Sequence, residues 1–250
     1  MTTSTKKPKT PAKLETQVAE AAKDLSLTLP DLIGEDGKAY EAWVMFKLAQ
    51  RLTQLGAVVG ARDHTDACTS VFRIKGGPGN IVSAHATGDQ PTHFRVAGPN
   101  QRALELHVSI EHVGSSGEVH EVDIGLIHAD VARIIRNHTN GAPYRGPRYL
   151  CLELKNYGQN AMLDKNISRA FVAVRIELQH DWVELPGGDL ISTQTRDRTY
   201  CLLTPASLTA TTVGMLHRYG IAAFPGAYPG TPQMDEFLDQ IAGDVWSLLT

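Results

Sequence analysis

Two alternating runs that meet at a short polar turn constrain the fold of this 250-residue chain more than any other feature. The runs are ALELHVSIEHV at 103–113 and GEVHEVDIGLIHA at 117–129, and the turn sequence GSSG lies where they meet, at 114–117. Apolar and polar side chains that alternate with a period of two are typical of β-strands with one buried face. Because so short a turn leaves no room for a crossover, we expect the two strands to form an antiparallel hairpin.

A long helix is expected ahead of this hairpin, at 38–56. Its apolar residues Met45, Leu48, Leu52 and Leu55 recur at spacings of three and four, and Gly56 follows where the helix should end. The rest of the chain shows no internal repeat and no clear linker after residue 30. We expect further strands at 57–62, 68–75, 92–97, 148–157 and 198–204, and further helices at 14–27, 131–138, 160–180, 207–220 and 231–249.

The composition is that of a globular protein. Hydrophobic residues make up 42% and charged residues 20%, which excludes collagen-like, coiled-coil and wholly disordered chains. Residues 1–13 are polar and rich in Lys and Pro, so we expect a disordered basic arm followed by a single α/β domain at 14–250. The three cysteines form no Cys-x-x-Cys pair, and no apolar run approaches the length of a membrane span. We therefore expect a cytoplasmic protein that does not cross a membrane.

Positive charge is concentrated in one segment, although the chain as a whole carries a net charge of −3. Residues 133–175 contain eight Lys or Arg and only two acidic residues. Such a segment either decorates exposed helix faces or attracts a polyanion at one place on an acidic protein. For the second case, we expect four residues to contact nucleic-acid phosphates, namely Arg145, Arg148, Lys165 and Arg169.

Four charged residues stand where the pattern predicts core. Glu41 lies on the apolar stripe of the helix at 38–56, Asp123 lies in the middle of a strand, and Glu153 and Lys155 share one face of the strand at 148–157. Taken singly, each has an ordinary explanation. Glu41 can be an acid in the first turn of its helix, Asp123 a strand acid that faces water, and Glu153 with Lys155 a surface ion pair. Taken together, two carboxylates on strands brought side by side form a hard-oxygen site suited to Mg²⁺. An adjacent lysine can orient the attacking water at a phosphodiester.

The facing of Asp123 follows from strand alternation. Val122, Ile124 and Leu126 are expected on one face of the strand, and Glu121 and Asp123 on the other. We therefore expect the Asp123 and Glu153 carboxylates to lie close enough to share one metal ion.

In order and residue type, this arrangement resembles the PD-(D/E)xK nuclease superfamily, over about residues 38–220. Asp123 matches the first Asp of the motif, Glu153 its second acid, Lys155 its lysine, and Glu41 the acid often found on the first core helix. The resemblance implies a restriction-endonuclease-like α/β/α sandwich with a central mixed β-sheet. It also implies phosphodiester hydrolysis with Mg²⁺, for which Mn²⁺ substitutes. The implied metal ligands are Asp123, Glu153 and the backbone carbonyl of Leu154, with Glu41 as a further ligand.

The resemblance leads us to expect a DNA endonuclease that acts on double-stranded DNA. Because a compact nuclease with no evident target-recognition domain needs restraint in a cell, we expect it to be an effector of a restriction or antiviral defence system. We expect a homo-oligomer or a subunit of a defence complex. The chain departs from the motif at Val122, where a Pro would stand, and in the long segment between the two acids. The alternative is a catalytically silent module of the same fold that binds nucleic acid or serves assembly. Four histidines lie in or near the hairpin and are expected as strand or loop residues rather than zinc ligands: His107, His112, His120 and His128.

Overall fold

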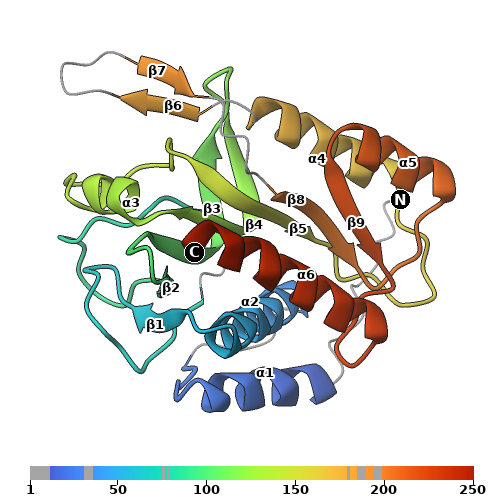
Figure 1. Ribbon diagram of the computed structural model, residues 1–250, viewed down its shortest axis with the longest axis horizontal. Helices are drawn as coiled ribbons and strands as arrows, with labels where there is room; N and C mark the ends of the chain where they lie inside the picture. Colours follow the sequence, from blue (N-terminus) through green and yellow to red (C-terminus); the bar gives the residue numbers. More distant parts are fainter. Residues whose placement is uncertain are drawn as a thin grey trace, which may run out of the picture.

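A seven-stranded mixed sheet lies at the centre of the computed structural model, which describes residues 12–30, 36–74, 77, 79–178, 181–184, 190–193 and 199–250 (Figure 1). The strand order is β1-β2-β3-β4-β5-β8-β9. Neighbours from β1 to β5 are antiparallel, whereas β5, β8 and β9 are parallel. The prediction of an α/β protein with a central mixed sheet is confirmed. The strands are β1 (Val58–Arg62), β2 (His93–Ala97), β3 (Ala103–Val113), β4 (Val119–His128), β5 (Arg148–Leu154), β8 (Thr199–Thr204) and β9 (Ile221–Pro225), with β6 (Asp181–Glu184) and β7 (Leu190–Thr193) in a separate two-stranded sheet.

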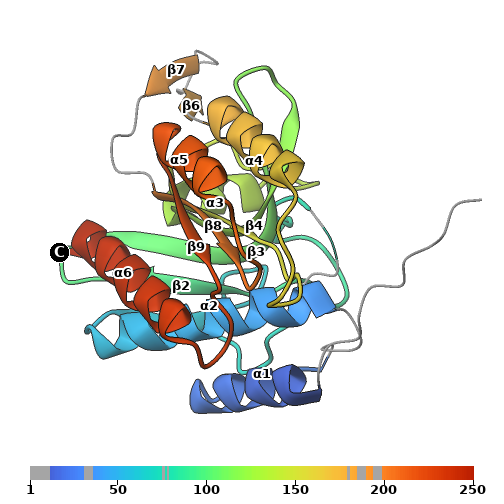
Figure 2. The ribbon, with the colours of Figure 1, turned by 90° about the vertical axis from the view of Figure 1, so that its right-hand side faces the viewer.

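Helices cover both faces of the large sheet (Figures 1 and 2). One apolar cluster joins the first face to α1, α2 and α6, and a second joins the opposite face to α3, α4 and α5. The core is therefore divided by the sheet into two halves, each closed by its own group of helices. The helices are α1 (Ala12–Asp24), α2 (Asp36–Gln54), α3 (Ala129–Arg136), α4 (Lys165–Glu177), α5 (Ala210–Arg218) and α6 (Pro232–Leu249).

Helix α2 follows its predicted apolar stripe. Met45, Leu48 and Leu52 are fully buried, which contributes about 1.5–3 kcal/mol for each side chain. The helix ends at Gln54, so Leu55 lies beyond it and is 43% exposed. Gly56 has a φ of 102°, a conformation that glycine adopts readily and other residues rarely do. The stripe is therefore one residue shorter than its periodicity predicts.

The strand predicted at 68–75 does not form a sheet strand within the described part of that segment. Its backbone makes isolated bridges instead, from Cys68 to Arg62 and from Val71 to Thr28. Phe72 is buried against Phe46 and Phe94, with ring centroids 5.1 and 4.8 Å away. The segment is thus an irregular connection that contributes an aromatic side chain to the core. In the other direction, β9 forms at Ile221–Pro225, where no strand was predicted.

The N-terminal prediction is tested only in part. Residues 1–11 of the expected arm lie outside the described residues, whereas α1 begins at Ala12 and includes the last two residues of that arm. In the described ranges, no helix combines the length and the hydropathy needed to cross a membrane.

Candidate active site

Asp123 and Glu153 lie on the adjacent antiparallel strands β4 and β5, beside Lys155. The ladder pairs Ile124 with Leu152, so the next step of the register places Asp123 opposite Glu153. The Lys155 Nζ lies 2.6 Å from Glu153 Oε1 and 3.3 Å from Asp123 Oδ2. The same Asp123 oxygen accepts a hydrogen bond of 2.7 Å from the backbone N–H of Leu154. Two carboxylates therefore converge on one cationic group, and the backbone fixes one of them.

In the β3–β4 hairpin, the regular alternation of side chains between the two faces of the sheet is interrupted next to Asp123. Ile124 packs in the first apolar cluster, whereas Val122 packs in the second, on the opposite face of the sheet. The same change occurs on β3, where Val108 and Ile110 belong to different clusters. The prediction that Val122 shares a face with Ile124 and Leu126 is therefore wrong.

On β3 this change coincides with Ser109. Its φ of 50° is left-handed, a conformation that costs a non-glycine residue roughly 1–3 kcal/mol. Ser109 stands opposite Asp123, between the ladder pairs Val108–Ile124 and Ile110–Val122. Since both strands reverse their facing there, these two buried polar residues lie at the point of reversal. Strained backbone of this kind is concentrated at functional sites in proteins.

Helix α2 brings a second ion pair to the same place. The Lys38 Nζ lies 2.9 Å from Glu41 Oε2 and 3.8 Å from Glu121 Oε1, and it also donates to the Ser109 hydroxyl. The Ser109 hydroxyl in turn donates to Glu41 Oε2 over 3.2 Å. Glu41 therefore approaches the hairpin from the helix as predicted. Lys38, Ser109 and Glu121 are neighbours of Glu41 that the sequence argument did not identify.

The electrostatics of the site show a surplus of negative charge. Burial and the neighbouring Asp123 carboxylate raise the pKa values of Glu41 and Glu153 to about 7. Burial opposes the charged form of Lys155, but the Glu153 and Asp123 carboxylates outweigh it and raise the Lys155 pKa above its ordinary value. Four carboxyl groups and two ammonium groups make up the cluster. With every group ionised its net charge is −2, which favours a divalent cation.

The residues predicted to contact nucleic acid fall into two groups. Arg145, Lys165 and Arg169 are exposed. Arg148 is only 1% exposed, and its guanidinium donates to His112 Nδ1 and to the carbonyl oxygens of Val113 and Leu178 at 3.1, 2.7 and 3.3 Å. The prediction that Arg148 contacts a phosphate is therefore wrong, because its guanidinium joins the hairpin to the end of α4.

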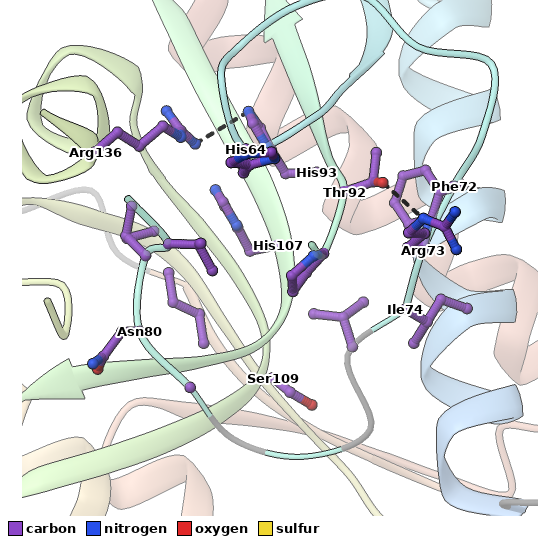
Figure 3. A pocket seen from close by; sticks show the side chains of 16 residues that line it. His64, Phe72, Arg73, Ile74, Asn80, Thr92, His93, His107, Ser109 and Arg136 are labelled. Atoms are coloured by element: carbon purple, nitrogen blue, oxygen red, sulfur yellow. Dashed lines mark hydrogen bonds between the residues drawn. The ribbon is translucent and has the colours of Figure 1, made fainter. Parts of the chain in front are cut away.

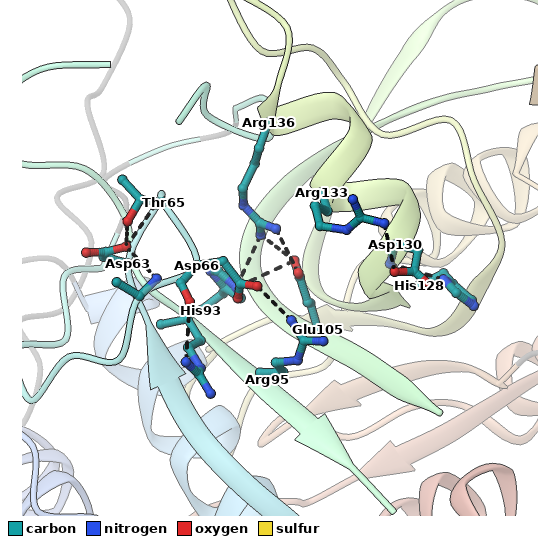
Figure 4. Close-up of polar contacts among 12 residues, drawn as sticks. Asp63, Thr65, Asp66, His93, Arg95, Glu105, His128, Asp130, Arg133 and Arg136 are labelled. Atoms are coloured by element: carbon teal, nitrogen blue, oxygen red, sulfur yellow. Dashed lines mark hydrogen bonds and ion pairs between the residues drawn. The ribbon is translucent and has the colours of Figure 1, made fainter. Parts of the chain in front are cut away.

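A second buried polar cluster, which the sequence argument missed, lies at the other end of β3. The ligand atoms of His93, Glu105 and His107 lie within 4.8 Å of one another, so their geometry would admit a metal ion. Figure 4 shows that Arg136 reaches into this group from α3. Arg136 donates to both oxygens of Glu105, with 2.7 Å to Oε1, and lies 3.2 Å from His93 Nε2. The guanidinium therefore already neutralises the acid, and a metal ion would have to displace it.

The protonation states of this cluster agree with a buried ion pair. Burial acts against ionisation of Glu105, but hydrogen bonds from His107 and Arg136 lower its pKa. Burial also lowers the pKa of His107 to about 4, so its imidazole is neutral at pH 7. The alternation of LELH at 104–107 places Glu105 and His107 on one face, and this was the available sequence signal.

A pocket borders both clusters. His64, Thr92, His93, His107 and Arg136 line it, and Ser109 lies at its edge (Figure 3). Ser109, which also donates to Glu41, is therefore shared between the pocket lining and the carboxylate site. No protein-family model, curated protein or solved structure matches this chain.

Proposed function

We propose that this protein is a metal-dependent nuclease that hydrolyses phosphodiester bonds in double-stranded DNA, built on a restriction-endonuclease-like α/β/α sandwich. One observation carries the proposal. The carboxylates of Asp123 and Glu153 converge on the ammonium group of Lys155, at 3.3 and 2.6 Å. Carboxylates can hold a hard divalent cation, and a lysine beside them can stabilise charge that develops on a phosphate.

The donor set fits Mg²⁺ or Mn²⁺. Every ligand group at the site offers oxygen, which hard divalent cations prefer. Asp123 and Glu153 would hold the ion, with the backbone carbonyl of Leu154 as a third ligand. When bound, the ion would supply Lewis acidity at the phosphate and a lowered pKa for water. The net charge of −2 on the ionised cluster is the charge that one such ion neutralises.

The other groups of the site have separate roles in the proposed reaction. The Leu154 N–H holds the Asp123 carboxylate in one orientation through its 2.7 Å hydrogen bond. Lys155 keeps its proton because its pKa is raised, so it acts as a cation that stabilises charge developing on the phosphate. Glu41 accepts hydrogen bonds from Lys38 and Ser109, so it holds the Lys38 ammonium group beside the hairpin.

The surroundings favour a polynucleotide over a small phosphoester. Lys165 and Arg169 are exposed and stand one helical turn apart on α4, where they can contact successive phosphates. Tyr157 is 44% exposed and follows Lys155 by two residues, so its ring is available to stack on a base or sugar.

The test compares the wild type with Asp123→Asn and Lys155→Ala in plasmid cleavage and in calorimetric Mn²⁺ titration. We expect Asp123→Asn to lose metal binding and cleavage together, although its amide oxygen can still accept the Leu154 N–H. We expect Lys155→Ala to keep the metal, or to bind it more tightly, and to lose about 10²–10³-fold in rate. Asp130→Asn, an exposed acid on α3, is the matched control and should behave as the wild type.

A protein can bind DNA without cleaving it. Measuring DNA binding and cleavage separately therefore distinguishes the nuclease from the catalytically silent module. A wild type that binds DNA but neither binds Mn²⁺ nor cleaves would refute the nuclease. The protein would then be a nuclease-fold module for nucleic-acid binding or assembly.

A further inference from the structure

Lys38 occupies a position in the site that its place on α2 alone does not explain. Its side chain is 17% exposed, although a lysine in the first turns of a helix can extend freely into water. Instead, the ammonium group lies among Glu41, Ser109 and Glu121, which come from α2, β3 and β4. Three separate elements therefore each supply an oxygen to one cationic group.

The oxygen atoms around Lys38 form a partial coordination shell. Two carboxylates, at 2.9 and 3.8 Å, and one buried hydroxyl face the ammonium nitrogen. A hard divalent cation would choose the same groups. Ser109 supplies its hydroxyl from a left-handed backbone position, so the fold accepts local strain to keep this group in place.

Charge sets the number of metal ions the site can hold. The ionised cluster, with its four carboxylates and two ammonium groups, carries −2, and one divalent ion at Asp123 and Glu153 brings it to zero. A second divalent ion would leave a charge of +2 in a largely buried place, beside the fixed charge of Lys38. In two-metal phosphodiesterases the second ion lies about 3.5–4 Å from the first and helps to stabilise the attacking and leaving oxygens.

We propose that the Lys38 ammonium stands in the place of a second divalent cation, so that this site works with a single metal ion. The inference rests on the proposed nuclease function. Glu41 is then a partner of Lys38 rather than a metal ligand. The positive charge that a second ion would bring near the reacting phosphate is supplied permanently by the chain.

The experiment counts metal ions rather than turnover. Mn²⁺ is titrated calorimetrically into the wild type, Lys38→Met and the double variant Lys38→Met/Glu41→Gln. Lys38→Met keeps the aliphatic stem and removes the charge, which leaves Glu41, Glu121 and Ser109 free to bind an ion. Lys47→Met is the matched control, because Lys47 is on the same helix and bonds only Gln50 among the contacts described for it. Electron paramagnetic resonance then reports whether two bound Mn²⁺ ions lie close enough to couple, at about 4 Å.

We expect one Mn²⁺ in the wild type, two coupled ions in Lys38→Met, and one again in the double variant and in Lys47→Met. Two ions in the wild type would overturn the inference, whether or not any variant folds. One ion in both the wild type and folded Lys38→Met would overturn it while leaving the nuclease proposal standing. No ion in the wild type would refute both. If Lys38→Met fails to fold, Lys38→Gln takes its place, because its amide still donates to the neighbouring oxygens while carrying no charge.

Discussion

Replacing Arg136 with methionine should destabilise the protein severely without touching the carboxylate site. The Arg136 side chain is 4% exposed and that of Glu105 is fully buried, and the two share a two-pronged ion pair (Figure 4). Methionine fills much of the same volume but leaves the Glu105 carboxylate, among the contacts described for it, with its 2.9 Å bond from His107 and with His93 Nε2 at 3.6 Å. Removing one partner of a buried ion pair costs about 3–5 kcal/mol, because the other charge stays buried without compensation.

The assay is thermal and urea unfolding followed by circular dichroism. For a chain of this size, about 3–5 kcal/mol corresponds to a fall in Tm of roughly 6–20 °C. Arg133→Met is the matched control, since Arg133 precedes Arg136 on α3 by three residues and forms an ion pair with Asp130 that is more than half exposed on both sides. Its loss should change stability by no more than about 0.5 kcal/mol.

A double variant tests whether the unpaired Glu105 charge causes the loss of stability. Adding Glu105→Gln to Arg136→Met removes the stranded charge, so it should restore a large part of the lost stability. An Arg136→Met protein within about 1 kcal/mol of the wild type would refute the reasoning, and so would a double variant less stable than Arg136→Met alone.

Three further outcomes follow from the geometry. Because the pKa of the proposed ligand Glu153 is raised to about 7, a bound proton competes with the metal, and Mn²⁺ affinity measured by calorimetry should rise as pH increases from about 6 to 8; a flat profile would contradict this. Gly125→Ala should cost about 1–3 kcal/mol in urea unfolding, because its Cβ would lie 2.9 Å from Ile110 Cγ2, whereas Gly214→Ala on α5 meets no described residue within 4 Å and should be neutral or stabilising. Arg169→Ala should weaken DNA binding for all sequences and reduce the salt slope by about 1; an unchanged slope would remove this residue from the interface.

Much of the fold could be predicted because its signals are local. The stripe of α2 and the alternation of β3 and β4 are patterns within single elements, and the turn at 114–117 joins the strands with one register. Alternation along β5 also places Glu153 and Lys155 on one side of their strand. Short-range periodicity was therefore sufficient to single out Asp123, Glu153 and Lys155 as charged residues within strands, but not to establish the facing of the residues around Asp123.

The tertiary structure decided what depends on distant partners. Nothing near Arg148 or Arg136 in the sequence distinguishes them from the exposed Arg145, yet both are buried because acceptors from other elements meet their guanidinium groups. The sequence pattern also did not predict that side chains change faces of the sheet at Ser109 and Asp123, because strict alternation assumes an unbroken strand. Lys38 belongs to the site only because α2 packs across the hairpin at that reversal. Periodicity determines which way a side chain points from its own element, but the charge it meets there is set by packing between elements.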